Sequence, residues 1–118
     1  MPQSMLALRF YKPGDLKAEQ VPIPEPSDGE LVVRTTVALT CGTDVKMYRR
    51  GHPLAKLPQI MGHEFAGTVT AVGRGVEKFK VGMKVAAANS APFNKCFYCL
   101  NHQPNLCEHL NESLVGFT

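Results

Sequence analysis

Two groups of side chains in this sequence have the chemistry of metal ligands. The first is Cys41 with the His63-Glu64 pair, which supplies a thiol, an imidazole and a carboxylate. Thiolate and imidazole are preferred ligands of zinc, and a catalytic zinc ion takes three protein ligands and keeps a fourth position for water or substrate. A single cysteine is more often a buried apolar residue than a ligand, so the residue types alone leave both interpretations open.

The second group is a set of three cysteines close together in the chain, Cys96, Cys99 and Cys107. The N-terminus lacks the charged-then-apolar order of a signal peptide, so we expect a cytoplasmic protein with reduced thiols. In that setting a C-x2-C pair indicates a metal site or a redox site. One hypothesis is therefore a small zinc-binding or redox module built on these three cysteines.

Composition narrows the classes of protein. The chain has 118 residues, which suits one domain over residues 1–118, and its 44% hydrophobic content argues against wholesale disorder. The net charge is +3 and no basic run exceeds Arg49-Arg50, which argues against a nucleic-acid partner. The apolar runs are too short for a membrane-spanning helix. A further possibility is an interaction β-barrel that makes no use of the Cys41, His63 and Glu64 set.

Short apolar or alternating runs between glycines and prolines predict a mainly β fold with few short helices. Cys41 follows the longest run and is in step with its alternating apolar positions, while His63 and Glu64 open the next convincing strand. We therefore expect Cys41 and His63 to converge, with sulfur and imidazole within about 6 Å. One helix is predicted, with Thr43 as its cap and Gly51 and Pro53 ending it. The predicted strands cover residues 5–12, 16–21, 31–40, 64–72, 84–88 and a last one near 115–118.

Residues 91–112 show no persistent period, so we expect an irregular lobe that the cysteines organise. Gly73 and Gly75 lack the third glycine of a dinucleotide-binding turn and are not followed by a clear helix. The sequence therefore offers no segment with the pattern of a nucleotide-binding Rossmann domain.

Three motifs carry a resemblance to a known family. They are Cys41-Gly42-Thr43-Asp44, then Gly62-His63-Glu64 with Phe65-Ala66-Gly67, then Val81-Gly82-x-Lys84-Val85. From about residue 5 to residue 107, the chain resembles the medium-chain zinc-dependent alcohol dehydrogenases, in particular the sorbitol/threonine dehydrogenase-like branch. The resemblance implies a GroES-like β-barrel catalytic domain with an irregular cysteine-containing lobe.

The resemblance also implies roles for individual residues. Cys41 and His63 become ligands of the catalytic zinc, and Glu64 becomes a neighbouring carboxylate that enters or leaves the coordination shell. Thr43 becomes the hydroxyl that receives the alcohol proton, and Asp44 the carboxylate that orients His63. Zinc lowers the pKa of the bound alcohol, and hydride passes to NAD or NADP.

The family resemblance sets expectations for the whole protein. We expect a homo-oligomeric dehydrogenase acting on a small-molecule alcohol or polyol. The family's Rossmann domain and one further zinc ligand have no counterpart in this sequence, so the resemblance implies an N-terminal segment that is inactive alone. Where close relatives often carry a histidine, this chain has Lys46, which would alter the outer proton relay.

The lobe departs from the family pattern of a structural zinc site, C-x2-C-x2-C-x7-C. Aligned on Cys107, the first ligand position falls on Phe93 rather than on a cysteine. Three thiolates with an open face would bind zinc more weakly, unless His102 or His109 completes the set. The alternative is that the lobe binds no zinc and that the Phe93 ring is buried against Phe97, Tyr98 or Leu100.

Overall fold

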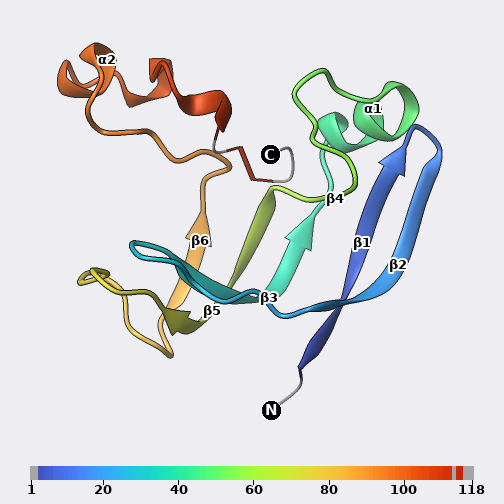
Figure 1. The fold of residues 1–118 in the computed structure, drawn as a ribbon, viewed down its shortest axis with the longest axis horizontal. Coiled ribbons are helices and arrows are strands. Elements are labelled where there is room, and N and C mark those ends of the chain that lie inside the picture. The colour runs from blue at the N-terminus through green and yellow to red at the C-terminus, as the bar shows by residue number, and fades with distance from the viewer. Residues whose placement is uncertain (1–2, 113, 116–118) are drawn as a thin grey trace.

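The computed structural model describes residues 3–112 and 114–115, which form two small β-sheets, a helix and an irregular lobe (Figure 1). Most of the expected strand near 115–118 lies outside the described residues. The strands are β1 (Ser4–Lys12), β2 (Asp15–Pro22), β3 (Leu31–Leu39), β4 (Gln59–Ile60), β5 (Glu64–Val72) and β6 (Lys84–Ala87). The helices are α1 (Gly42–Arg50), the one-turn α2 (Phe97–Leu100) and two 3-10 turns at Pro104–Leu106 and Leu110–Glu112.

The first sheet has the order β2-β1-β4, and all its neighbours are antiparallel. β1 and β2 form a hairpin whose turn contains Pro13 and Gly14. Gly14 adopts a φ of 79°, which glycine reaches without steric cost, and its N–H donates to the carbonyl of Tyr48 in α1. The hairpin turn is thereby attached to the helix. The short strand β4 was not expected from the sequence.

The second sheet has the order β3-β5-β6 and is also antiparallel. Two bulges interrupt the pairing of β3 with β5: Thr70 is the extra residue on β5 and Thr36 the extra residue on β3. Because the extra residues lie on opposite strands, the second bulge restores the register that the first one shifts. Leu31 pairs with Val72 at one end, and Leu39 pairs with Glu64 at the other.

Gly67 lies inside this bulged region, opposite Thr35. A Cβ atom at this position would overlap the backbone carbonyl of Arg34 and would lie 2.8 Å from a side-chain carbon of Val33. Only glycine therefore allows β3 and β5 to approach each other here.

The best-buried packing joins the first sheet to α1. Phe10 and Met47 are fully buried against each other, and Met61 and Leu114 pack around them. Elsewhere the inner faces are less covered: Leu6, on the same face of β1 as Phe10, is 68% exposed. Val37 and Leu39, two of the alternating apolar positions of β3, are exposed. The bulge at Thr36 interrupts the alternation between Thr35 and Val37.

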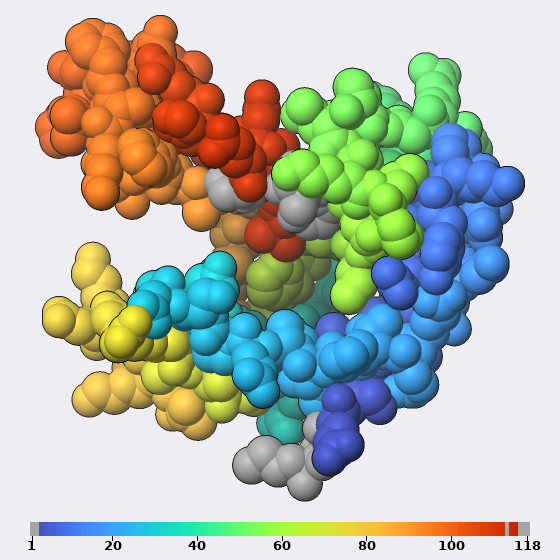
Figure 2. Space-filling view, viewed as in Figure 1, coloured from blue at the N-terminus to red at the C-terminus, as the bar shows by residue number. Residues whose placement is uncertain are grey.

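The mainly β fold is as predicted, although the two sheets are not joined into a closed barrel by any strand pairing among the described residues. The lobe of residues 91–112 projects from the body, and an indentation separates it from the loop after β5 (yellow in Figure 2). In the described part of the chain, no helix has the length and apolar character needed to cross a membrane.

Candidate metal centres

The ends of β3 and β5 bring Cys41 and His63 together. Leu39 pairs with Glu64, so Cys41 after β3 and His63 before β5 lie at the same end of the sheet. The Cys41 Sγ atom is 3.1 Å from the His63 Nε2 atom, within the separation expected from the sequence. We call Cys41, Thr43, Asp44, His63 and Glu64 the sheet-end site.

Helix α1 begins at this site, and Cys41 is its N-cap. The Cys41 sulfur accepts the Thr43 N–H at 3.3 Å, while Asp44 Oδ2 accepts the Cys41 N–H at 3.0 Å. These reciprocal bonds form a capping box with a thiol in the place usually taken by a hydroxyl. The prediction that Thr43 caps the helix was wrong by two residues, because cysteine is not among the preferred N-cap types.

Asp44 also fixes the histidine. Its Oδ1 atom lies 3.4 Å from His63 Nδ1, and both residues are buried. A proton on Nδ1 is therefore directed toward the carboxylate, which leaves the Nε2 electron pair directed toward the Cys41 sulfur. One carboxylate thus orients the imidazole and caps the helix that carries the thiol.

A cavity of about 490 Å³ opens over the sheet-end site. Thr43 and Glu64 both line it, so the structure brings every residue proposed for this site to one place. Sequence reasoning missed the rest of the lining, where Ala87 ends β6 and Ala88 and Asn89 follow it. The only available signal was that the predicted strand 84–88 ends there.

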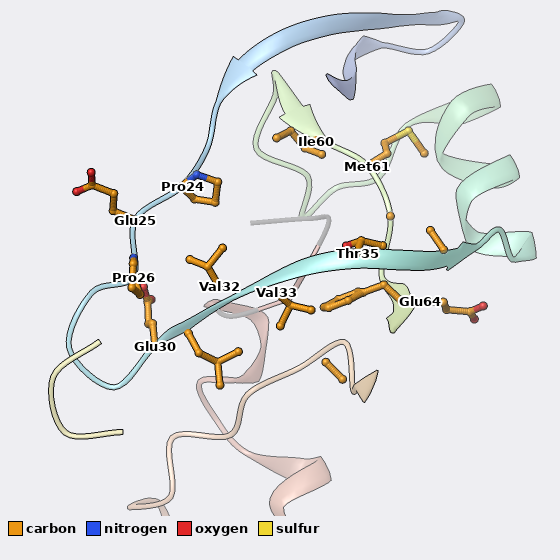
Figure 3. A pocket seen from close by; sticks show the side chains of 15 residues that line it. Pro24, Glu25, Pro26, Glu30, Val32, Val33, Thr35, Ile60, Met61 and Glu64 are labelled. Carbon is orange, nitrogen blue, oxygen red and sulfur yellow. The ribbon is translucent and has the colours of Figure 1, made fainter. Parts of the chain in front are cut away.

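A second, largely apolar cavity of about 510 Å³ lies between the two sheets (Figure 3). The Pro24–Pro26 segment forms one wall, and β3 residues such as Val32 and Val33 form another. Ile60 and Met61 lie at its far end. Glu64 and Phe65 line both cavities, so the apolar space adjoins the sheet-end site.

The donor set of the sheet-end site fits zinc. Tetrahedral zinc with ordinary Zn–S and Zn–N bonds places the two ligand atoms about 3.6 Å apart. The observed 3.1 Å between sulfur and nitrogen needs only a small adjustment. Cys41, Asp44 and His63 offer ligand atoms that all lie within 4.8 Å of one another. Because Asp44 faces the far nitrogen of the imidazole, we assign it the orienting role rather than a ligand role.

The lobe brings three other thiols together, and we call Cys96, Cys99 and Cys107 the three-thiol cluster. The Cys96 and Cys99 sulfurs are 3.4 Å apart, and all three lie within 4.8 Å of one another. Cys96 and Cys107 are buried. No nitrogen of His102 or His109 belongs to this group in the described part of the lobe.

Backbone N–H groups change the acidity of these thiols. The backbone N–H groups of Cys99 and Glu108 favour the thiolate of Cys96 and lower the pKa of that thiol to about 7. Burial and the neighbouring thiols Cys96 and Cys107 instead raise the pKa of Cys99. The lobe therefore favours the thiolate of Cys96 and disfavours the thiolate of Cys99.

Phe93 does not fill the missing ligand position in the way the sequence suggested. Its side chain is 49% exposed, and its ring lies against the His109 ring with centroids 4.8 Å apart. The expected burial of this ring against Phe97, Tyr98 or Leu100 was wrong. The Phe93 backbone takes part instead, because its N–H donates to the Cys107 sulfur at 3.2 Å.

The two-sheet β domain carries a thiol–imidazole pair at one sheet end, a donor set that zinc-binding domains use. Residues 27–117 match the family described as the alcohol dehydrogenase GroES-like domain, and this chain belongs to that family. The family resemblance drawn from the three motifs is confirmed, together with the mainly β, GroES-like fold class.

The relatives described next are two proteins named as dehydrogenases and one starvation-sensing protein, each about three times as long as this chain. The starvation-sensing protein RspB of Escherichia coli (strain K12) is 40% identical over 106 residues, covering 90% of this chain and 31% of that protein. Sorbitol dehydrogenase of Bacillus subtilis is 34% identical over 91% of this chain and 31% of the relative. L-threonine 3-dehydrogenase of Pyrococcus horikoshii is 34% identical over 92% of this chain and 32% of the relative. The chain thus spans about a third of these proteins.

Solved structures agree on the fold. The structure described as a short chain alcohol dehydrogenase (rspB) of E. coli CFT073 in complex with NADH has a TM-score of 0.86 and 37% identity, covering 98% of this chain and 33% of that one. A cobalt- and zinc-bound thermostable alcohol dehydrogenase of Pyrobaculum aerophilum has a TM-score of 0.89 and 29% identity, covering 98% and 36%.

Proposed function

We propose that this chain is the catalytic domain of a zinc-dependent, NAD- or NADP-dependent alcohol or polyol dehydrogenase. The observation that carries the proposal is the Cys41–His63 pair, 3.1 Å apart with Asp44 behind the imidazole. Relatives named for sorbitol and threonine oxidation, and structures that hold NADH or zinc, support the substrate class and the cofactors.

Cys41 and His63 would hold the metal, and Glu64 lines the same cavity as a carboxylate that can enter the coordination shell. When bound, zinc supplies Lewis acidity that lowers the pKa of a bound alcohol. Asp44 Oδ1 faces the imidazole Nδ1 at 3.4 Å, an arrangement that favours the tautomer with its proton on Nδ1 and makes Nε2 available at the metal position.

Thr43 is the residue we propose to accept the alcohol proton. It follows the N-cap by two residues and lines the cavity beside Cys41 and His63. A hydroxyl can accept a proton at its oxygen while it passes its own proton outward, so no charge accumulates at the site. Lys46, exposed on the same helix, is the proposed outlet of this relay to solvent.

The wider setting completes the proposal. All four cysteines are free thiols, which suits a reducing cytoplasm. Hydride transfer requires a bound nicotinamide, and the family resemblance assigns that task to a Rossmann domain of the whole protein, which we expect to be a homo-oligomer. We expect the 118-residue chain alone to bind metal and to catalyse no nicotinamide reduction.

The metal part of the proposal is tested in a Cys99→Ser background, where the three-thiol cluster is disabled. Addition of Zn²⁺ should shift the His63 imidazole resonances at one equivalent, and the further substitution Cys41→Ser should abolish this shift. Serine keeps an oxygen at the N-cap, so the helix is preserved. An unchanged His63 signal in the presence of Zn²⁺ would contradict the proposed metal site.

The catalytic part is tested in the whole protein with a panel of alcohols and polyols. Thr43→Ala should lower kcat by about 10²–10⁴-fold, the usual contribution of a positioned proton acceptor. The matched variant Thr43→Ser keeps a hydroxyl and should retain most of the activity. Equal activity of the alanine and serine variants would remove Thr43 from the proton path.

A further inference from the structure

We propose that the three-thiol cluster binds one thiophilic metal ion through three sulfurs only, and that an exchangeable ligand from solvent fills the fourth position. Such a site differs from a closed structural zinc site, in which four protein ligands exclude solvent. The proposal does not depend on the dehydrogenase activity, because the cluster lies in the lobe and shares no residue with the sheet-end site.

The separations of the sulfurs suit a shared metal ion. Two thiolates on tetrahedral zinc lie about 3.8 Å apart for ordinary Zn–S bonds. The Cys96–Cys99 distance is 3.4 Å, and no pair in the cluster exceeds 4.8 Å. A single ion between the three sulfurs therefore requires shifts of less than an ångström or so.

One of the sulfurs also receives a backbone N–H. The Phe93 N–H donates to the Cys107 sulfur at 3.2 Å. Donors of this kind stabilise negative sulfur. Three thiolates this close together repel one another, so the arrangement is complete only with a cation between them.

The fourth position has no protein ligand in the described part of the lobe. Phe93 stands where a fourth cysteine would, and its ring turns away to lie against His109. The His109 Nδ1 atom is 3.3 Å from a Glu112 carboxylate oxygen, and neither nitrogen of this imidazole belongs to the group of ligand atoms in the described part of the lobe. A metal ion bound by the three thiolates would take its fourth ligand from solvent.

The first experiment uses the chain with Cys41→Ser, which leaves the lobe as the thiolate site. Titration with Co²⁺ should give one equivalent with sulfur-to-cobalt charge-transfer absorption, and added imidazole should change the visible spectrum because it enters the open position. Cys99→Ser in this background should abolish the absorption. Zn²⁺ should displace the Co²⁺.

The second experiment closes the site. Phe93→Cys adds a sulfur at a residue whose backbone already contacts Cys107, so Zn²⁺ affinity should rise on the order of a hundredfold, about one ligand's share of a structural site. The imidazole response should then disappear. Leu100→Cys, an exposed position in the same lobe, is the matched control and should change neither property. His109→Ala should leave the wild-type affinity and imidazole response intact.

Three results would overturn the proposal. One is the absence of Co²⁺ binding in the Cys41→Ser chain while the thiols are reduced. Another is a cobalt spectrum that ignores imidazole, or that is lost in His109→Ala, because either shows a site closed by the protein. The third is a purified chain whose Cys96 and Cys99 are joined in a disulfide that outcompetes Zn²⁺ under a cytoplasm-like ratio of thiol to disulfide.

Discussion

The sheet-end site and the cysteine lobe each gather soft ligands, but they are held in different ways. Two strand ends and a helix cap position Cys41 and His63, and the helix packs on the Phe10–Met47 core. The lobe contains a one-turn helix, two 3-10 turns and a Phe93 N–H that donates to the Cys107 sulfur. The first site is therefore preformed by the fold, whereas the second depends on the charges at its own centre.

The largest loss of stability is expected at Gly67, where β3 and β5 approach each other and hold the sheet-end site in place. Gly67→Ala forces a Cβ into the Arg34 carbonyl, so β3 and β5 must separate, at a cost of about 3 kcal/mol or more in the free energy of unfolding. Denaturant unfolding measures this cost. Gly42→Ala is the control, because a Cβ at that position meets no atom within 4 Å, and it should unfold like the wild type.

The next largest effect is a fall in zinc affinity that is confined to one of the two sites. Asp44→Asn removes the charge behind His63, so zinc affinity at the sheet-end site should fall about 10–100-fold. Helix stability should fall by no more than about 1 kcal/mol, since asparagine retains an acceptor for the Cys41 N–H. Competition titration in the Cys99→Ser background gives the affinity. The control combines Asp44→Asn with Cys41→Ser and measures the zinc affinity of the three-thiol cluster. An equal loss of affinity there would contradict the independence of the two sites.

A smaller effect is expected from the ring that the sequence placed in the core of the lobe. Phe93→Ala removes a half-exposed ring that contacts His109 and Lys95, so we expect a loss of about 1 kcal/mol or less. Proteolysis of the lobe at equal metal loading reports this loss. A much greater sensitivity would show that the ring, and not the metal, holds the lobe.

The smallest effect is expected from pH in the metal-free chain. The folded state lowers the pKa of Cys96 to about 7. The stability that this thiolate contributes is therefore fully present above the ordinary thiol pKa and is lost as the pH falls through about 7. The raised pKa of Cys99 works in the opposite direction above the ordinary thiol value. Stability should therefore rise modestly between about pH 7 and 9, and Cys96→Ser should remove the rise.

Much of this comparison could be predicted from the sequence. Strand periodicity located β1, β2, β3, β5 and β6 to within one or two residues, and the strand ends predicted that Cys41 and His63 meet. Local patterns did not reveal the two bulges, because a bulge depends on the partner strand. The exposure of Val37 and Leu39 has another cause, since residues 34–39 of β3 are exposed on both faces.

The remaining errors have similar causes. A thiol N-cap is uncommon, so the nearby Thr43 hydroxyl was preferred to Cys41. The neighbouring Phe97, Tyr98 and Leu100 suggest a small apolar core in the lobe, and this pattern predicts burial of the Phe93 ring. The structure instead places sulfurs at its centre and leaves the ring half exposed.

The paired bulges of β3 and β5 have a genetic consequence. Thr36 and Thr70 have no partner across the sheet, and all the pairs from Leu31–Val72 to Leu39–Glu64 are made by the residues around them. Deletion of either threonine therefore removes one bulge and leaves the strand ends that carry Cys41 and His63 in phase. Deletion of a paired residue such as Ala38 shifts every pair beyond it unless a new bulge forms. The two threonines are thus the positions at which β3 and β5 can each lose one codon while the sheet-end site keeps its geometry.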